Sequence, residues 1–285
     1  MKWQAGRRSS NVEDRRGSGV PTGAVATGGL GTIVLALIVI ALGGDPSFLL
    51  DPSPSSTSGP GTTTSRARSP EEDQLADFTS AVLADTEDTW NVLFRKMGRT
   101  YQEPKLVLFT GAVQSACGFA QAAVGPFYCP GDQKVYIDLS FYQDLKTQHQ
   151  APGDFAQAYV VAHEVGHHVQ TLLGISQQVQ AAKQRVSEVQ GNQLSVRQEL
   201  QADCFAGVWA HHGQKERQIL EEGDVEEALN AASSIGDDRL QRQARGYISP
   251  ESFTHGSSEQ RVRWFTQGIK TGDINQCNTF EARRL

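Results

Sequence analysis

The sequence predicts an α+β domain that is mostly helical, with a small sheet in its first third, preceded by one transmembrane helix. Three observations support this prediction. No charged residue occurs from Gly17 to Gly44, which is typical of a membrane-spanning segment. Two β-rich runs follow at 105–110 and 134–139. After Asp154, apolar residues recur almost entirely at helical spacing.

The composition excludes some classes of protein. Of the 285 residues, 38% are hydrophobic and 20% are charged, and both fractions are below those of a typical globular protein. This deficit indicates a segment that does not pack. The net charge of −6 and the pI of about 5.7 argue against a general nucleic-acid-binding protein, so we expect no nucleic-acid partner.

The apolar segment 24–43 is long enough to cross a bilayer, since its 20 residues would form about 30 Å of α-helix. Five basic and two acidic residues give segment 1–16 a charge of +3, and such a flank stays in the cytoplasm. We therefore expect a cytoplasmic tail over 1–23, a single-pass anchor in the cell membrane over 24–43, and an extracytoplasmic remainder. A cleaved signal peptide and a buried core helix are the alternatives. The apolar run is longer than the ~7–15 residues of a signal-peptide core, and a linker follows it.

A flexible linker is expected over 44–68, where Pro, Ser, Thr and Gly dominate and little can be buried. A folded domain is expected over 69–285. Ser69 is a good helix cap, Pro70 suits the first helical position, and apolar residues then recur at helical spacing up to Gly98.

The strongest chemical pattern is the run HEVGH. On a helix, His163 and His167 share one face and can bind one metal ion. Glu164 lies beside the first of them, close enough to take a proton from a metal-bound water. The context is helical, since Asp154 resembles an N-terminal cap and Gly174 a C-terminal stop. The alternative is a helix with two exposed histidines, because so short a pattern also arises by chance.

A catalytic zinc site needs three protein ligands and one open position. Glu199 and Asp203 form a second i, i+4 pair on a predicted helix downstream. Small residues beside them would let this helix pack closely against the first. A solvated pair of surface acids is the alternative, but the neighbouring Phe205 and Trp209 argue against a surface position.

These motifs together resemble a known family. His163-Glu-x-x-His167 followed by Glu199-x-x-x-Asp203 resembles the gluzincin metallopeptidases. Four stretches are similar to the predicted neutral zinc metallopeptidases of bacteria: GPFYCPGDQKVYIDLSFY (125–142), HEVGHHVQ (163–170), ELQADCFAGVWA (199–210) and SFTHGSSEQRVRWF (252–265). The resemblance spans roughly 70–285 and implies a zincin-like metallopeptidase domain with a small sheet before the zinc helix.

By this resemblance, His163, His167 and Glu199 would hold one Zn²⁺ per chain. Glu164 would act as the general base, and Asp203 would hydrogen-bond a ligating histidine and fix its tautomer. The activity implied is hydrolysis of a peptide or protein substrate by a zinc-activated water, as in an endopeptidase. The sequence does not predict the oligomeric state.

The segment Thr254–Arg261 resembles the His-Pro-x-x-x-x-Arg element of CAAX-type and related membrane metallopeptidases, with Gly256 in place of the proline. By this resemblance, His255 is a candidate catalytic residue that donates to the oxyanion. The alternative is a cap or a surface group, and Tyr247 is a weaker candidate for the same role. The other histidines have no assigned chemistry and are His149, His168, His211 and His212.

In gluzincins an edge strand beside the cleft pairs with the extended substrate backbone. By resemblance, and by its position before the zinc helix, Val135–Leu139 is the candidate for this strand. The alternative is an ordinary internal strand.

Four cysteines allow three disulfide pairings. Pairing Cys117 with Cys129 and Cys204 with Cys277 closes the shortest loop and would tie the C-terminal region to the metal site. Disulfides suit an extracytoplasmic location, and free buried thiols are the alternative.

The sequence therefore predicts a membrane-anchored, zinc-dependent peptidase of the cell envelope. The alternative is a non-catalytic envelope binding protein that retains a structural zinc on a peptidase fold. Glu164 favours the enzyme, because a structural zinc needs no adjacent general base and fills its fourth position with a protein ligand.

Overall fold

The computed structural model describes residues 1–17 and 68–285. The predicted anchor over 24–43 lies outside these ranges, as does the predicted linker except for Arg68. In the described ranges, no helix combines the length and the hydropathy that a membrane crossing requires.

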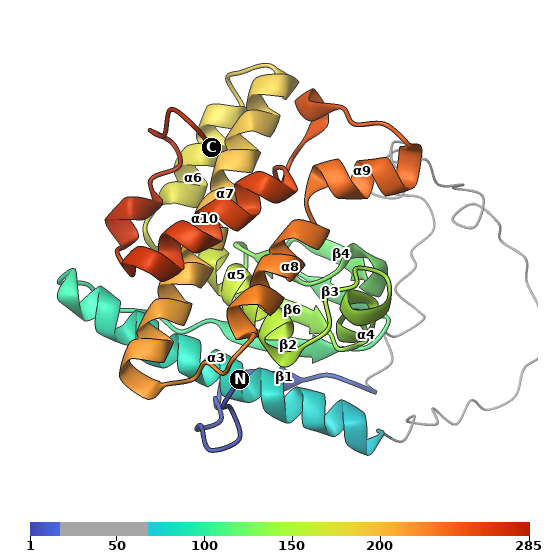
Figure 1. Cartoon of the computed structure of the whole chain (residues 1–285), viewed down its shortest axis with the longest axis vertical. Helices are drawn as coiled ribbons and strands as arrows, with labels where there is room; N and C mark the ends of the chain where they lie inside the picture. The colour runs from blue at the N-terminus through green and yellow to red at the C-terminus, as the bar shows by residue number, and fades with distance from the viewer. Residues whose placement is uncertain (18–67) are drawn as a thin grey trace, which may run out of the picture. The chain divides into compact units, whose positions relative to one another are not determined.

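The described residues form a mostly helical α+β fold with a small sheet, as predicted (Figure 1). The strands are β1 (Val12–Asp14), β2 (Lys105–Phe109), β3 (Ala112–Ser115), β4 (Gly118–Gln121), β5 (Phe127–Cys129) and β6 (Lys134–Asp138). The α-helices are α3 (Pro70–Lys96), α4 (Ser140–Thr147), α5 (Asp154–Leu172), α6 (Ile175–Lys183), α7 (Glu188–Arg217), α8 (Asp224–Ser234), α9 (Asp237–Arg245) and α10 (Ser258–Thr271). Short 3₁₀ helices are η1 (Ala122–Val124), η2 (Pro250–Ser252) and η3 (Ile274–Cys277).

The larger sheet has the strand order β1-β2-β6-β5. β1 and β6 both run parallel to β2, whereas β5 runs antiparallel to β6. A separate two-stranded sheet pairs β3 with β4. The expectation that Val135–Leu139 is an edge strand is therefore wrong, because β6 lies inside the sheet. The edge on that side is β5, which precedes β6 in a hairpin.

Segment 1–16 belongs to the same folded unit as residues 68–285. Val12 pairs with Leu106 in parallel register, and the side chain of Met1 is buried in the hydrophobic core. The expectation of a separate cytoplasmic tail over 1–23 is thus wrong for these residues.

Three of the five basic residues that suggested a cytoplasmic flank, Arg7, Arg8 and Arg16, form ion pairs with acids on α3. Arg8 lies 2.6 Å from Asp77, and the buried Arg16 lies 3.1 Å from Asp73. Their positive charge is therefore explained by partners within the folded unit.

α3 begins as predicted, with a capping box in which Ser69 accepts from the backbone N–H of Glu72 and the Glu72 carboxylate accepts from that of Ser69. α5 begins differently from the expectation. Its cap residue is Gly153, which makes no side-chain cap bond, and Asp154 is the first helical residue. The Asp154 carboxylate instead pairs with the N-terminal ammonium of Met1 at 2.5 Å.

α7 packs against both α5 and α10 (Figure 1), and glycines allow the close approach. A Cβ at Gly166 on α5 would lie only 3.0 Å from the backbone oxygen of Ala202 on α7. A Cβ at Gly207 on α7 would collide with the backbone oxygen of Phe265 on α10. Three helices thereby meet where the chemically distinctive residues lie.

The two disulfides follow the predicted pairing, Cys117 with Cys129 and Cys204 with Cys277. The first ties the turn between β3 and β4 to the edge strand β5. The second ties α7 to η3 near the C-terminal end. Both therefore hold peripheral segments against elements that position the site.

Candidate metal centre

His163 and His167 on α5 and Glu199 on α7 bring their side chains together. Nε2 of His163 lies 3.2 Å from Nε2 of His167 and 3.2 Å from Oε2 of Glu199. Nε2 of His167 lies 3.5 Å from Oε1 of Glu199. The i, i+4 spacing places the two rings on one face of α5, and the close packing of α7 supplies the carboxylate. The structure thus gathers the three residues that the sequence predicts as ligands.

The outer ring nitrogen of each histidine has its own partner. Nδ1 of His163 lies 2.8 Å from Asp203, and Nδ1 of His167 lies 2.9 Å from Oε1 of Gln170. A carboxylate only accepts, and Gln170 donates its amide N–H to the backbone of Gln198, so both partners accept here. In the neutral rings, Nδ1 therefore carries the proton and Nε2 presents a lone pair to the centre.

Asp203 thus lies where the resemblance places it, against a candidate ligand. Gln170 is a partner that the sequence analysis missed. Its position three residues after His167, on the same helical face, could have indicated it.

The donor set fits a zinc ion. Two imidazole Nε2 atoms and a carboxylate face one another at 3.2–3.5 Å, so a single cation between them can be shared by all three groups. Two imidazoles and one carboxylate, with a fourth position left open, form a ligand set of catalytic zinc. Among the described residues around the centre, the carboxylates Glu164, Glu199 and Asp203 outnumber the single guanidinium Arg261. The excess negative charge favours a divalent cation.

The pKa shifts reflect the same excess of negative charge. Burial lowers the pKa of His163, but the charge and hydrogen bond of Asp203 outweigh it and raise the pKa to about 10. Burial raises the pKa of Glu199, but the charge of His167 and hydrogen bonds from both histidines hold it well below its usual range. Protons therefore compete with a metal for this site, and metal binding releases them.

Asp203 is completely buried and is held by two further residues. Arg261 on α10 donates to both carboxylate oxygens, at 3.0 Å and 2.9 Å, and Tyr159 donates its hydroxyl at 2.5 Å. Burial raises the pKa of Asp203, but the charge of Arg261 outweighs it and lowers the pKa to about 2. Asp203 therefore stays ionised and fixes the ring of His163. The pairing of Arg261 with Asp203 was not predicted from the sequence.

The centre opens into a cleft of about 1260 Å³. Glu164 lines this cleft together with His163 and His167, and its side chain is largely buried. Phe127 and Tyr128 of the edge strand β5 line the same cleft. The strand that borders the cleft is therefore β5 and not the predicted Val135–Leu139.

His255 also lines the cleft, from the loop between η2 and α10. Asp237, the first residue of α9, holds this loop. Its Oδ2 accepts the three consecutive backbone N–H groups of residues 254–256 at 2.6–3.0 Å, and its Oδ1 accepts from Nδ1 of His255 at 3.2 Å. Burial lowers the pKa of His255, but the hydrogen bond to Asp237 and the charge of Glu199 raise it above its ordinary value.

Gly256 explains why this loop departs from the His-Pro pattern. Its φ of 92° lies in the left-handed region, which proline cannot adopt. The role of Asp237 was not predicted, because nothing in the local sequence connects it to His255.

The other histidines lie outside the metal centre. His168 is fully buried and bonds a backbone oxygen at 2.6 Å, and burial lowers its pKa to about 4. His211 and His212 bond backbone oxygens near the end of α10. His149 lines the cleft, although no sequence motif pointed to it, whereas Tyr247 is 62% exposed and is not among the lining residues.

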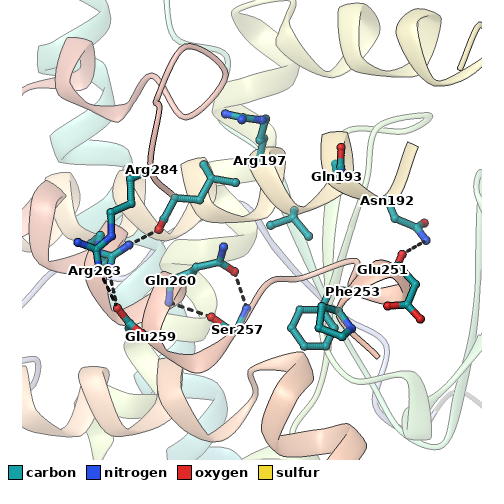
Figure 2. A pocket seen from close by; sticks show the side chains of 13 residues that line it. Asn192, Gln193, Arg197, Glu251, Phe253, Ser257, Glu259, Gln260, Arg263 and Arg284 are labelled. Atoms are coloured by element: carbon teal, nitrogen blue, oxygen red, sulfur yellow. Dashed lines mark hydrogen bonds and ion pairs between the residues drawn. The ribbon is translucent and has the colours of Figure 1, made fainter. Parts of the chain in front are cut away.

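A second cavity, of about 600 Å³, lies between α7, η2 and the start of α10 (Figure 2). Its polar side chains engage one another, since Glu259 pairs with Arg263 and Arg284, and Ser257 exchanges hydrogen bonds with Gln260. None of the groups of described residues that could hold a metal ion lies here. The group formed by His163, His167 and Glu199 lies at the first cleft instead.

Comparison with known proteins agrees with this geometry. The chain is 53% identical to "Uncharacterized protein YpfJ" of Escherichia coli strain K12 over 288 residues, which cover 98% of this chain and 99% of that protein. It is 40% identical to "Uncharacterized protein Rv2575" of Mycobacterium tuberculosis strain ATCC 25618 / H37Rv over 257 residues, which cover 86% and 85% of the two chains. No solved structure matches the chain. Residues 1–280 match the family described as "Putative neutral zinc metallopeptidase", and the chain belongs to that family.

Proposed function

We propose that the protein is a zinc-dependent endopeptidase of the HExxH type, in which His163, His167 and Glu199 hold one zinc ion and Glu164 is the general base. The observation that carries this proposal is the convergence of the three ligand side chains in a cleft that Glu164 also lines. The family supports zinc as the metal and a peptide or protein as the substrate.

Bound zinc would polarise the substrate carbonyl and lower the pKa of water in the open position. Glu164 takes a proton from the attacking water and passes it to the leaving amine. Asp203 keeps the proton of His163 on Nδ1, so that Nε2 stays free for the metal. His255 donates a hydrogen bond to the developing oxyanion, and Asp237 holds its ring in place.

Two features of the cleft support cleavage within a chain rather than at its end. The edge strand β5 borders the cleft, where it can pair with an extended substrate backbone. An exopeptidase needs a fixed charge beside the metal to bind a free terminus. Among the described lining residues, Arg261 is already paired with Asp203, and His255 is assigned to the oxyanion. Asp144 and Lys183 lie on α4 and α6, and neither of these helices carries a metal ligand.

We further propose that the folded unit lies outside the cytoplasm, in the cell envelope, which its two disulfides support. Segment 24–43 is retained as a proposed membrane attachment, but not as a single crossing, because a single crossing would put its two flanks on opposite sides of the membrane. The joining of 1–16 with 68–285 in one unit supports a topology in which both flanks of that segment lie on the same side of the membrane.

Removing the metal should abolish hydrolysis reversibly. We expect the full-length protein to lose at least roughly 100-fold in rate on a quenched-fluorescence peptide library after treatment with 1,10-phenanthroline, because the Lewis acid contributes several kcal/mol. One equivalent of Zn²⁺ should restore the rate, whereas Mg²⁺ should not, because it prefers an all-oxygen ligand set. Hydrolysis that persists in the metal-free protein would contradict the proposal.

The rate should fall at alkaline pH as His255 loses its proton. Asp237 raises the pKa of His255, so Asp237→Asn should return it toward its ordinary value of about 6.5 and move the alkaline fall in rate to lower pH. Below about pH 6, where His255 is protonated in both proteins, the variant should come closest to the wild-type rate. The measurement is kcat between about pH 5 and 10, and an unshifted alkaline limb would exclude the role given to Asp237.

A further inference from the structure

One wall of the cleft carries no charge. Residues 122–127, which comprise η1 and the start of β5, line the cleft together with the metal centre. They belong to a stretch, 111–131, that contains no Asp, Glu, Lys or Arg, in a chain of which 20% is charged. Val124 within this wall is 66% exposed. If an apolar group of a ligand covered the Val124 side chain, apolar surface would be removed from water, and this burial lowers the free energy of the complex.

The wall is fixed to the rest of the domain. The disulfide between Cys117 and Cys129 ties the β3–β4 hairpin to β5. Asp132 accepts the backbone N–H of Ala116 at 3.0 Å. The ring of Phe127 stacks on a tyrosine of β6, with 4.8 Å between ring centroids. Because this wall is already ordered, a substrate that binds to it does not carry the entropic cost of ordering it.

A second part of the cleft lining is polar but almost uncharged. Its residues come from α6, the C-cap of α6 and α7, and are Ser176, Gln177, Gln180, Gln184, Ser195 and Gln198. Amide and hydroxyl groups can hydrogen-bond a peptide backbone without selecting a charge. Outside the metal centre, His255 and the paired Arg261, the charged side chains among the described lining residues are Asp144 and Lys183.

We propose that the cleft selects an extended polypeptide segment with apolar, uncharged side chains beside the scissile bond, and that residues 122–127 contact those side chains. The inference rests on the proposed peptidase function. The occupant is the peptide substrate, because residues 122–127 and the metal centre line the same cleft. A Lys or Glu side chain against the wall would lose hydration without gaining a partner of opposite charge. An apolar side chain would bury its own surface and that of Val124.

Peptide binding by the full-length Glu164→Gln protein tests this inference without turnover. The probes are two fluorescein-labelled decapeptides, one with Leu-Phe-Ala-Leu at its centre and one with Lys-Glu-Lys-Glu, and the readout is fluorescence anisotropy. We expect the apolar peptide to bind at least ~10-fold more tightly, which corresponds to about 1.4 kcal/mol. Equal dissociation constants, or no binding of either peptide, would overturn the inference.

A second substitution locates the selectivity. Val124→Asp in the same background should remove most of the preference for the apolar peptide. Val92→Asp is the matched control, because Val92 is also an exposed valine, lies on α3 and is not part of the cleft lining. An unchanged preference in Val124→Asp, with zinc still bound, would show that residues 122–127 are not the selecting surface.

Wild-type turnover separates this inference from the proposed function. Cleavage of both decapeptides with equal kcat/KM would overturn the selectivity and leave the peptidase proposal standing. Preferential binding of the apolar peptide without cleavage by the wild type would overturn the peptidase proposal and leave the selectivity of the cleft standing.

Discussion

Replacing Glu164 with Gln should reduce peptide hydrolysis by roughly 10²–10⁴-fold, the usual contribution of a general base. Glutamine has nearly the same shape as glutamate but cannot take a proton from the attacking water. The metal should remain bound, because Glu164 is not one of the three converging ligands. The measurement is kcat/KM on quenched-fluorescence peptides beside the zinc content of the same preparation.

The control is Glu188→Gln, since Glu188 is an exposed glutamate in the first turn of α7. This variant should hydrolyse the peptides at the wild-type rate. A Glu164→Gln protein that matched the wild type would contradict the catalytic role of Glu164. It would favour the alternative function, a binding protein that retains zinc on a peptidase fold.

Replacing Arg261 with Met should destabilise the protein by about 3–5 kcal/mol, because it leaves the carboxylate of Asp203 buried without its cation. Both side chains are nearly inaccessible to solvent, and the guanidinium bonds both oxygens of Asp203. Zinc should also bind more weakly, since Asp203 would no longer hold the ring of His163 in one orientation. Urea unfolding and chelator competition measure the two effects.

Arg263→Met is the matched control on the same helix. Arg263 pairs with Glu259 at the surface, where an ion pair is worth at most about 1 kcal/mol. Its loss should therefore change neither stability nor zinc affinity much. An Arg261→Met protein as stable as the Arg263→Met protein would contradict the account of the buried pair.

The core of the candidate site could be predicted because its pattern is local. His163 and His167 lie one helical turn apart, so their convergence needs only a helix. Glu199 and Asp203 repeat that spacing, and small residues beside them, such as Ala202 and Gly207, indicated that this helix could pack closely against the first.

The partners of these residues could not be predicted, because they come from distant parts of the chain. Arg261 reaches Asp203 from a helix 58 positions later, and Asp237 reaches His255 across 18 positions. Neither pairing leaves a periodic pattern in the sequence. Only the packing of α7 on α10 and the fold of the loop before α10 bring these charges together.

The N-terminal segment was misinterpreted for a related physical reason. A cluster of arginines before an apolar run has the composition of a cytoplasmic flank, whatever its partners are. In the fold, Arg8 and Arg16 pair with acids on α3, and β1 adds to the sheet beside β2. The internal position of β6 has a different cause, since β5 folds back on it as a hairpin and covers the side that β2 leaves open.

The zinc content of the full-length protein beside its Glu199→Ala variant tests the central claim most directly. The chain should include residues 1–16, because they complete the sheet. We predict close to one zinc ion per wild-type chain, and zinc that is readily lost to a chelator from the variant, which keeps only two of the three converging ligands. A well-folded wild-type protein that binds no zinc would contradict the account.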